Sequence, residues 1–281
     1  MHRIVKKERL NEEMTQISVE APLVANKIKP GQFIVIRMHE KGERIPLTFY
    51  KKDVDKGTVS MIFQKVGKST YELDTYEEGD ELQDVVGPMG KPAELKKYGT
   101  VVCIGGGVGT PEVFPLAKAL KEEGNEVIVI SGFRTKDLVI CEADMDEACV
   151  DEMYVATDDG SYGTEGFTSH ILEDLIDKGK DIDLVHAVGP PIMMKVIADI
   201  TEEENILTKV SLNSIMLDAT GMCGSCRVEV GGEMKLACVD GPEFDAHEVN
   251  FEELLQRITM FQGQEEKALN KWKEEHEGCC Q

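Results

Sequence analysis

From residue 99 onward the chain alternates short apolar segments with helical ones, and this alternation restricts the fold more than any other feature of the sequence. The segments that resemble buried strands are TVVCIGGGVG, EVIVISGF, EMYVATDDG and DLVHAVGP, and those with a helical pattern are TPEVFPLAKALKEEG, TSHILEDLIDKG and PIMMKVIADI. Strands that alternate with helices build a parallel sheet, and ligands bind at the carboxyl ends of its strands. We therefore expect an α/β domain over residues 98–205.

Three loops that follow these strands are rich in glycine. In GGGVGT (105–110), between a strand and a helix, backbone N–H groups and the helix N-terminus can approach a pyrophosphate. The loops TDDGSYGTEG (157–166) and AVGPP (187–191) would line the same crevice. The first loop is not the usual G-x-G-x-x-G, and no acidic residue stands clearly at the ribose-binding distance. Together the loops predict a dinucleotide site, with NAD or NADP left open, although each alone is also typical of an ordinary turn.

Residues 1–97 have the pattern of strands. MTQISVEA, GQFIVIRM and TVSMIFQKV are rich in β-branched residues, are separated by Gly, Pro and Asp, and show no helical period. A small antiparallel barrel is the expected fold. Within it, RIPLTF (44–49) and IFQKVGKST (62–70) offer the donors Arg44, Thr48, Ser69 and Thr70 to a diphosphate or a flavin ring edge.

The stretch DATGMCGSC (218–226) has the spacing D-x4-C-x2-C, and Cys238 follows it. Plant-type [2Fe-2S] proteins use C-x4-C-x2-C and a distant fourth cysteine. An aspartate in the first position can bind iron through oxygen, so the predicted ligands are Asp218, Cys223, Cys226 and Cys238. The glycines between them allow a tight loop with N–H groups directed at sulfur. This predicts a [2Fe-2S] module over residues 206–245.

Two other interpretations of these cysteines stay open. One is a zinc site completed by Cys279, Cys280 or His247. The other is a metal-free C-x-x-C redox pair, in which Cys238 would have no role. The remaining cysteines, Cys103, Cys141 and Cys149, lie in predicted regular structure and are expected to be inert core thiols. Cys279 and Cys280 end a polar tail, for which disorder is expected.

The net charge of −22 argues against a nucleic-acid or anionic membrane surface, because phosphate contacts need clustered Lys and Arg. No apolar run is long enough to span a bilayer, and the N-terminus lacks the apolar segment of a secretory signal. We therefore expect a cytoplasmic protein whose cysteines are reduced or bind metal. Residues 246–281 read as an amphipathic, helical C-terminal extension.

The order of RIPLTF, IFQKVGKST, GPMGKP, GGGVG, DDGSYG, AVGPPIMM and the cysteine cluster resembles the ferredoxin–NADP reductase superfamily over nearly the whole chain. Within it, the cysteine module resembles that of iron–sulfur electron-transfer subunits, such as those of dihydroorotate dehydrogenase and of NADH-dependent reduced ferredoxin:NADP oxidoreductase. Asp218 in the first ligand position and the helical extension favour the small (alpha) subunit of the second enzyme.

The resemblance implies an antiparallel barrel that binds FAD, followed by a parallel-sheet domain that binds NAD(H). It assigns FAD contacts to Pro46, Leu47, Thr48, Ile62, Phe63, Gln64, Ser69 and Thr70, and NAD(H) contacts to Gly105, Gly106, Gly107, Gly109, Thr110, Asp159, Gly160, Gly189 and Pro190. One departure is that the family's arginine would stand at Ile45, whereas Arg44 is one position early. A strand irregularity would restore its contact with the diphosphate.

The implied function is a relay from NADH through FAD and a [2Fe-2S] cluster to a larger subunit with its own flavin and iron–sulfur clusters. By resemblance, that heterodimer would perform electron bifurcation between ferredoxin, NADH and NADP. One alternative is the electron-transfer subunit of dihydroorotate dehydrogenase. The other is a non-catalytic, zinc-stabilised nucleotide-binding module.

Overall fold

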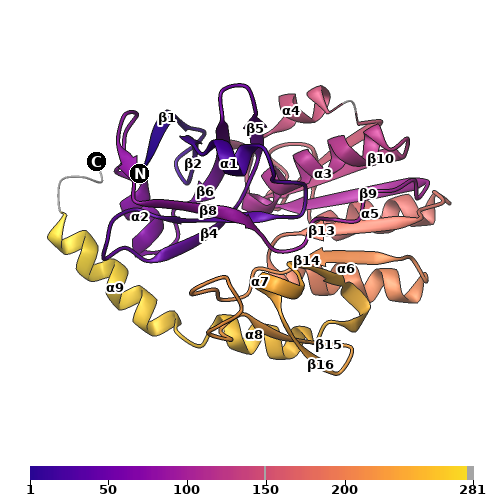
Figure 1. The fold of residues 1–281 in the computed structure, drawn as a ribbon. Coiled ribbons are helices and arrows are strands. Elements are labelled where there is room, and N and C mark those ends of the chain that lie inside the picture. Colours follow the sequence, from indigo (N-terminus) through magenta and orange to yellow (C-terminus); the bar gives the residue numbers. More distant parts are fainter. Residues whose placement is uncertain (149, 277–281) are drawn as a thin grey trace.

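Two antiparallel sheets form the N-terminal barrel (Figure 1). The computed structural model of the chain describes residues 1–148 and 150–276, so the predictions for Cys149, Cys279 and Cys280 lie outside the described residues. The first sheet contains, in spatial order, β5 (Lys51–Asp53), β6 (Thr58–Gln64), β2 (Met14–Glu20), β1 (His2–Arg9) and β7 (Glu81–Leu82). The second contains β4 (Arg44–Thr48), β3 (Phe33–Arg37) and β8 (Asp84–Met89). The predicted antiparallel barrel is confirmed.

Alternating residues of both sheets fill the core of the barrel, including Ile17, Ile34, Met61 and Phe63. Two short helices also belong to this part, α1 (Pro22–Ala25) and α2 (Lys68–Asp74). The sequence pattern of residues 1–97 had indicated no helix, so these two helices correct that prediction. Helix α2 has 7 residues, about two turns, which is too short for a helical period to stand out from the neighbouring strands.

Seven strands form the sheet of the second domain, and all but one of its neighbouring pairs are parallel. Their spatial order is β12 (Thr164–Glu165), β11 (Glu152–Thr157), β10 (Glu126–Phe133), β9 (Thr100–Gly106), β13 (Leu184–Val188), β14 (Thr208–Ser211) and β17 (Glu243–Asp245). Its helices are α3 (Thr110–Glu122), α4 (Glu142–Glu147), α5 (Thr168–Asp177) and α6 (Pro191–Glu203). Short 3₁₀ turns span Gly107–Gly109, Lys136–Leu138 and Ala246–Glu248. The predicted alternation of strands and helices is confirmed.

Both faces of this sheet are covered, which explains why its strands are apolar throughout. In β9, Val101 and Cys103 pack with helix α3, whereas Val102 and Ile104 pack with α5 and α6 on the other face. Helix α3 ends before Gly124, whose φ of +83° suits glycine at the end of a helix. The sheet is therefore a rigid layer with its strand ends presented at one edge.

The cysteine-bearing segment is inserted between two strands of the same sheet. Strand β14 precedes it and β17 follows it, and the two pair directly. The insertion contains the hairpin β15 (Arg227–Val230) and β16 (Glu233–Leu236), followed by α7 (Ala237–Asp240). Its apolar side chains share one core with α5 and α6. The module is thereby packed against the parallel sheet instead of being a separate body.

Two helices end the described chain, α8 (Phe251–Ile258) and α9 (Gln262–Glu275). Figure 1 shows α9 running from the module back to the barrel, where it lies beside α2. Trp272 is buried there, with its ring 6.2 Å from that of Tyr71, and Lys273 Nζ lies 4.5 Å from the Tyr71 ring centre. The predicted helical extension thus connects the module with the barrel. Within residues 1–148 and 150–276, no helix has the length and hydropathy to cross a bilayer.

A buried carboxylate fastens α2 to the barrel strands. Asp74 accepts a hydrogen bond from Thr15 Oγ1 at 2.6 Å and lies 3.0 Å from Arg9 Nη2 and 3.4 Å from Lys65 Nζ. Burial acts to raise the pKa of Asp74, but the hydrogen bonds and cations outweigh it, so the pKa lies below its usual value. The carboxylate therefore stabilises the fold above the unfolded-state pKa of about 3.9.

We expect Asp74→Asn to lower the free energy of unfolding by about 2 kcal/mol at pH 7, because two cations lose their counter-ion. The difference from the unchanged protein should shrink as the pH falls from about 4 through the lower folded-state pKa, where Asp74 itself becomes protonated. Urea unfolding at several pH values measures it, with the exposed Glu12→Gln as control. An equal difference at pH 3 and pH 7 would contradict the assignment.

Candidate cofactor sites

The first glycine-rich loop lies where the connections of the sheet change direction. Strand β9 has β10 on one side and β13 on the other, which makes the gap between β9 and β13 the switch point at which α/β sheets bind ligands. Residues 105–110 form the end of β9 and the turn that follows it, and Gly189 and Pro190 directly follow β13. A Cβ built on Gly189 would lie 3.1 Å from Gly106 Cα, so two of the predicted loops are in contact.

The glycines of this loop have different structural roles. A Cβ would lie 2.6 Å from Thr110 Cα at Gly105, 2.6 Å from Met193 Sδ at Gly106, and 2.4 Å from the Val188 carbonyl oxygen at Gly109. These three are needed for close packing. At Gly107, which has φ +54°, an added Cβ would meet no atom of residues 1–148 and 150–276 within 4 Å, apart from its chain neighbours. Gly107 is thus the position whose backbone is open to an approaching ligand.

Three hydroxyls near the carboxyl ends of β9 and β10 are buried and, within the described part of the chain, have no hydrogen-bond partner: Thr110 Oγ1, Ser131 Oγ and Thr168 Oγ1. Buried hydroxyls are normally paired, so these fit a polar ligand such as the ribose and pyrophosphate of a dinucleotide. Thr110 was predicted from the sequence. Ser131 lies inside an apolar strand and Thr168 starts α5, and neither carries a motif that would have identified it.

The third loop lies farther from the switch point. Asp159 and Gly160 follow β11, and β10 separates this strand from β9. The Asp159 carboxylate accepts hydrogen bonds from the backbone N–H and the hydroxyl of Ser161. These two residues are therefore placed for the outer end of an extended dinucleotide that starts at β9.

In the barrel, β4 presents Arg44, Pro46 and Thr48 on one face, because side chains alternate along a strand. Ile45 and Leu47 pack toward the barrel core on the other face. The pairing of β4 with β3 is regular from Arg44 to Thr48, so the strand irregularity considered for Arg44 is absent from this pair. The exposed Arg44 nevertheless lies on the same face as Thr48, which keeps it among the candidate contacts.

The other predicted barrel contacts divide by burial. Ile62 and Phe63 have side chains that are 5% and 1% exposed, so they can offer a ligand only their backbone. Gln64 Nε2 donates to Glu13 at 2.7 Å. Ser69 and Thr70 lie in the first turn of α2, where the Ser69 hydroxyl bonds Glu43 and Thr70 Oγ1 accepts from the Gly67 N–H. The three polar side chains, Gln64, Ser69 and Thr70, lie at and just after the end of β6.

Barrel and sheet meet at a carboxyl group that the sequence analysis did not identify. Glu112, in the first turn of α3, accepts hydrogen bonds from Thr48 Oγ1 at 3.0 Å and from Ser211 Oγ at 2.6 Å. Burial raises the pKa of Glu112 above its usual range, although the two hydroxyls lower it in part. Thr48 is therefore placed at the interface where a flavin bound to the barrel and a nucleotide bound to the sheet would meet.

The four predicted metal ligands form two pairs. Cys223 N donates to Asp218 Oδ2 at 2.8 Å, and the sulfurs of Cys226 and Cys238 lie 3.2 Å apart. Cys226 and Cys238 are buried, whereas Cys223 is exposed. The first contact is made by the backbone of Cys223 and not by its sulfur, and residues 1–148 and 150–276 contain no group of three or more His, Cys, Asp or Glu side chains gathered for one metal ion. A [2Fe-2S] cluster needs two protein ligands at each iron, and the Cys226–Cys238 pair is the one whose sulfurs already lie together. The donor set thus fits a [2Fe-2S] cluster with one oxygen ligand.

Local hydrogen bonds favour the ionised forms of two of these ligands. A hydrogen bond from the Thr220 N–H lowers the pKa of Asp218, and the Ser225 hydroxyl lowers the pKa of Cys223. Burial raises the pKa of Cys238, and Cys226 raises it further, while a backbone hydrogen bond from Gly221 lowers it. An N–H group directed at a ligand sulfur is the arrangement that the glycines predicted.

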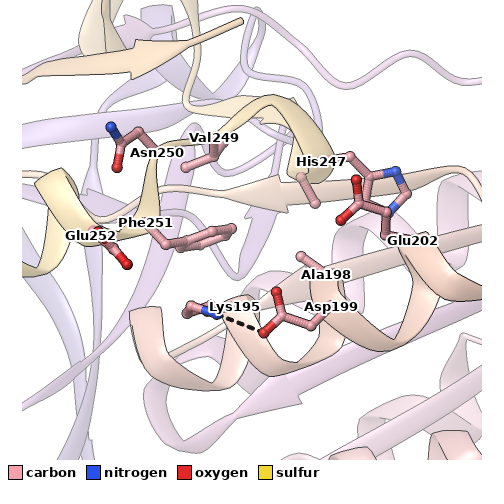
Figure 2. A pocket seen from close by; sticks show the side chains of 10 residues that line it. Lys195, Ala198, Asp199, Glu202, His247, Val249, Asn250, Phe251 and Glu252 are labelled. Carbon is pink, nitrogen blue, oxygen red and sulfur yellow. Dashed lines mark hydrogen bonds and ion pairs between the residues drawn. The ribbon is translucent and has the colours of Figure 1, made fainter. Parts of the chain in front are cut away.

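His247, considered as a zinc ligand, is engaged elsewhere. It lines an open pocket of about 220 Å³ between α6 and the start of α8. Figure 2 shows the side chains that line this pocket. The Nε2 atom of His247 lies 3.0 Å from Thr201 Oγ1. Among the other cysteines, Cys103 is fully buried, and burial raises its pKa and that of Cys141 to about 12. The raised pKa values agree with the inert role expected for both thiols, but Cys141 is half-buried and stands at the residue before α4, outside regular structure.

Residues 213–250 match the iron–sulfur cluster binding domain of dihydroorotate dehydrogenase B. Over 97% of the chain and 95% of the relative, the sequence is 45% identical to a dihydroorotate dehydrogenase B (NAD(+)) electron transfer subunit homolog of Thermotoga maritima. It is 33% identical to the electron transfer subunit of that enzyme from Geobacillus thermodenitrificans, over 88% of the chain and 96% of the relative. The chain belongs to the family of dihydroorotate dehydrogenase B electron transfer subunits.

A solved structure extends this result. The NADH-dependent reduced ferredoxin-NADP oxidoreductase, determined in work on flavin-based electron bifurcation, superimposes with a TM-score of 0.92 at 43% identity, over 97% of this chain and 98% of the other. The ferredoxin reductase fold and the family predicted from the motifs are thus confirmed. As a member of the family, the chain is an oxidoreductase subunit of the iron–sulfur flavoprotein class. The iron–sulfur match also favours a cluster over zinc at the cysteines.

Proposed function

We propose that this chain passes electrons from NADH through FAD to a [2Fe-2S] cluster held by Asp218, Cys223, Cys226 and Cys238, and from there to a larger partner subunit. The nicotinamide gives two electrons as a hydride, and a flavin can release them one at a time. The sheet would orient the dinucleotide at Gly107 and at the free hydroxyls. The barrel would hold the flavin ring at Thr48, facing the nucleotide. The free thiols of the described cysteines suit the cytoplasm as the compartment.

The observation that carries this proposal is the position of the two ligand pairs. The pair Cys226 and Cys238 lies in the core that the module shares with the parallel sheet. A cluster built there is fixed relative to the strand ends at which the dinucleotide and the flavin meet. Rigid placement of redox centres is what the protein contributes to electron transfer.

The surface around the cysteine loop supports a protein partner. Leu217, Met222 and Val239 are 61%, 89% and 43% exposed and lie within or next to the ligand segment. Exposed apolar side chains that gather at one place are typical of protein interfaces. A partner docked there would come close to the cluster and could accept its electrons.

The extent of similarity favours a partner of the ferredoxin-NADP oxidoreductase type. The Geobacillus subunit matches 88% of the chain, whereas the Thermotoga homolog and the solved oxidoreductase match 97%. Because the solved oxidoreductase covers 97% of this chain, most of α8 and α9 lies within the part that the two structures share. A dihydroorotate dehydrogenase partner, which the name of the Geobacillus relative suggests, is the second candidate.

Native purification tests the proposal. We expect one FAD, two irons and two sulfides per chain, with flavin and iron–sulfur absorbance that NADH bleaches, and a larger flavin- and iron-containing protein that stays bound. A co-purifying dihydroorotate dehydrogenase would decide for the second candidate. A colourless chain with one zinc would contradict both.

The oxygen ligand gives a further prediction. An aspartate donates less charge to iron than a thiolate, so Asp218→Cys should move the midpoint potential of the cluster to more negative values, on the order of tens of millivolts. EPR-monitored redox titration measures it. The control is Asp240→Asn, in the same module but outside the ligand set. An unmoved midpoint would show that Asp218 does not bind the cluster.

A further inference from the structure

A hydride equals one proton and two electrons. If NADH delivers a hydride to the flavin and the electrons leave singly through the cluster, one proton remains on the flavin and must leave by another route. An iron–sulfur cluster carries electrons only, so the proton leaves through water or through protein groups at the flavin edge. The groups of this chain that remove the proton can be inferred from the structure, and this inference rests on the proposed function.

The carboxyl group of Glu112 is placed to accept this proton. Both of its carboxyl oxygens accept a hydrogen bond from a hydroxyl, Thr48 of the barrel on one side and Ser211 of β14 on the other. A hydroxyl that donates to a carboxylate still has lone pairs to accept a proton from its other side. Thr48, a predicted flavin contact, can therefore pass a proton from the ring edge to Glu112. No cation is paired with Glu112 among the described residues, and burial favours its neutral form.

A second pair of titratable groups, His186 and Glu243, lies beyond Ser211 in the sheet. Ser211 on β14 stands opposite Glu243 on β17, and His186 lies on the neighbouring strand β13. His186 Nε2 and Glu243 Oε2 are 2.7 Å apart in a buried setting. His186 and Glu243 lie near enough to Glu112 to shift its pKa in opposite directions, downward and upward respectively. His186 Nδ1 is buried and has no partner in the described chain, so it has a free site for a proton or a water.

The end of this series of groups, at Glu243, lies near solvent. Glu243 is 16% exposed, and its charge interacts with Lys209, whose ammonium lies 3.7 Å from Asp245 with both side chains partly exposed. The other titratable groups that feel Glu243 are the Cys103 thiol and the Tyr98 hydroxyl. These two have pKa values raised to about 12 and do not exchange protons near neutral pH. The proton route therefore continues through the His186–Glu243 pair, whose side chains are in contact. Burial acts to raise the pKa of Glu243, but His186 and Lys209 outweigh it, so the pKa lies below its usual value.

We propose that Thr48, Ser211, Glu112 and the His186–Glu243 pair form a proton exit from the flavin site. When the two electrons have left for the cluster, the Thr48 hydroxyl accepts the remaining proton and gives its own to the Glu112 carboxylate. Glu112 then passes a proton through Ser211 to the His186–Glu243 pair, and from there to solvent. One hydride enters, two electrons and one proton leave, and no other reactant is consumed. Glu112 acts through Thr48, without touching the flavin.

Glu112→Gln tests the proposal in the complete protein with its cofactors. Glutamine keeps the size, accepts from one hydroxyl through its carbonyl oxygen and donates to the other through its amide nitrogen, but it cannot take up a proton. In stopped-flow experiments, reduction of the flavin by NADH should stay within about threefold of the unchanged protein. One-electron reoxidation should slow by about 100-fold and lose its solvent deuterium isotope effect, since proton transfer by a placed group contributes 10²–10⁴-fold. Flavin content should not change, and the pH dependence of the flavin midpoint potential should lose one inflection.

The matched control is Glu122→Gln, an exposed carboxyl at the other end of α3, which should leave every readout unchanged. Ser211→Ala interrupts the proton exit beyond Glu112 and should slow reoxidation by about 10-fold.

If Glu112→Gln does not fold, infrared difference spectra of the unchanged protein decide, because a carboxylic acid band must appear during reoxidation. Unchanged reoxidation in both variants, or no such band, would overturn the proton exit. A protein without flavin or cluster would instead overturn the proposed function.

Discussion

Cys226→Ser is expected to abolish the iron–sulfur cluster, with iron and sulfide falling from two per chain to near zero. Cys226 is 1% exposed and its sulfur lies 3.2 Å from that of Cys238, so no other thiol can take its position. Even the loss of a group outside the ligand shell lowers metal affinity 10–100-fold, and loss of a ligand costs more. NADH should still reduce the flavin, while transfer to a one-electron acceptor should fall by more than about 100-fold. Iron analysis and stopped-flow spectroscopy measure both effects.

Cys103→Ser is the matched control for this change. Cys103 is equally buried, on β9 beneath α3, and lies outside the module. Both variants place a hydroxyl in an apolar core, at a cost of about 1–3 kcal/mol. The two should therefore lose similar stability, but only Cys226→Ser should lose iron. Full iron content in both Cys226→Ser and Cys226→Ala, the second of which removes every donor atom of the side chain, would refute the ligand assignment.

Gly109→Ala is expected to disable the dinucleotide site. The φ of Gly109 is −75°, which alanine accepts, so the effect is purely steric. The new Cβ would lie 2.4 Å from the Val188 carbonyl oxygen and 3.0 Å from Gly189 N, and both are backbone atoms that cannot turn aside. Relief requires the end of β13 and the start of α3 to move apart, at about 1–3 kcal/mol. Since 1.4 kcal/mol corresponds to a factor of ten, NADH affinity should fall about 10-fold or more.

Fluorescence titration with NADH measures this loss, and the flavin content reports on the barrel, which should be unaffected. Gly263→Ala in α9 is the control, because a Cβ there meets no atom within 4 Å. Unchanged NADH affinity in Gly109→Ala would show that the dinucleotide does not bind at the β9–β13 switch point.

The parts of the fold that depend on neighbours in sequence were predicted well. The segment EVIVISGF coincides with β10, and the helix that starts at TPEVF spans Thr110–Glu122 and ends before Gly124. Such elements follow from periodicity and from Gly and Pro at their ends. Helix α2 was missed because two turns are too short to show a period.

The sequence contains no comparable pattern that predicts which strands pair when they lie far apart along the chain. Strands β14 and β17 belong to the parallel sheet, yet they are short and stand on either side of the cysteine module. Nothing local to residues 208–211 or 243–245 indicates which strand each will meet. The sequence could place a module near residues 206–245, but not show that it grows out of the sheet edge.

The amino-acid sequence by itself determined the family and the kinds of cofactor, and it predicts the four metal ligands, because ligand spacing and glycine-rich turns are properties of a few consecutive residues. Tertiary structure alone decided that Thr48, Glu112 and Ser211 meet, since they come from three elements far apart in the chain. It also separated the packing glycines from Gly107, which depends on what lies opposite each Cα. Motifs of a few consecutive residues can be recognised in the sequence, whereas the contacts that would move a proton or admit a ligand form only when distant segments pack together.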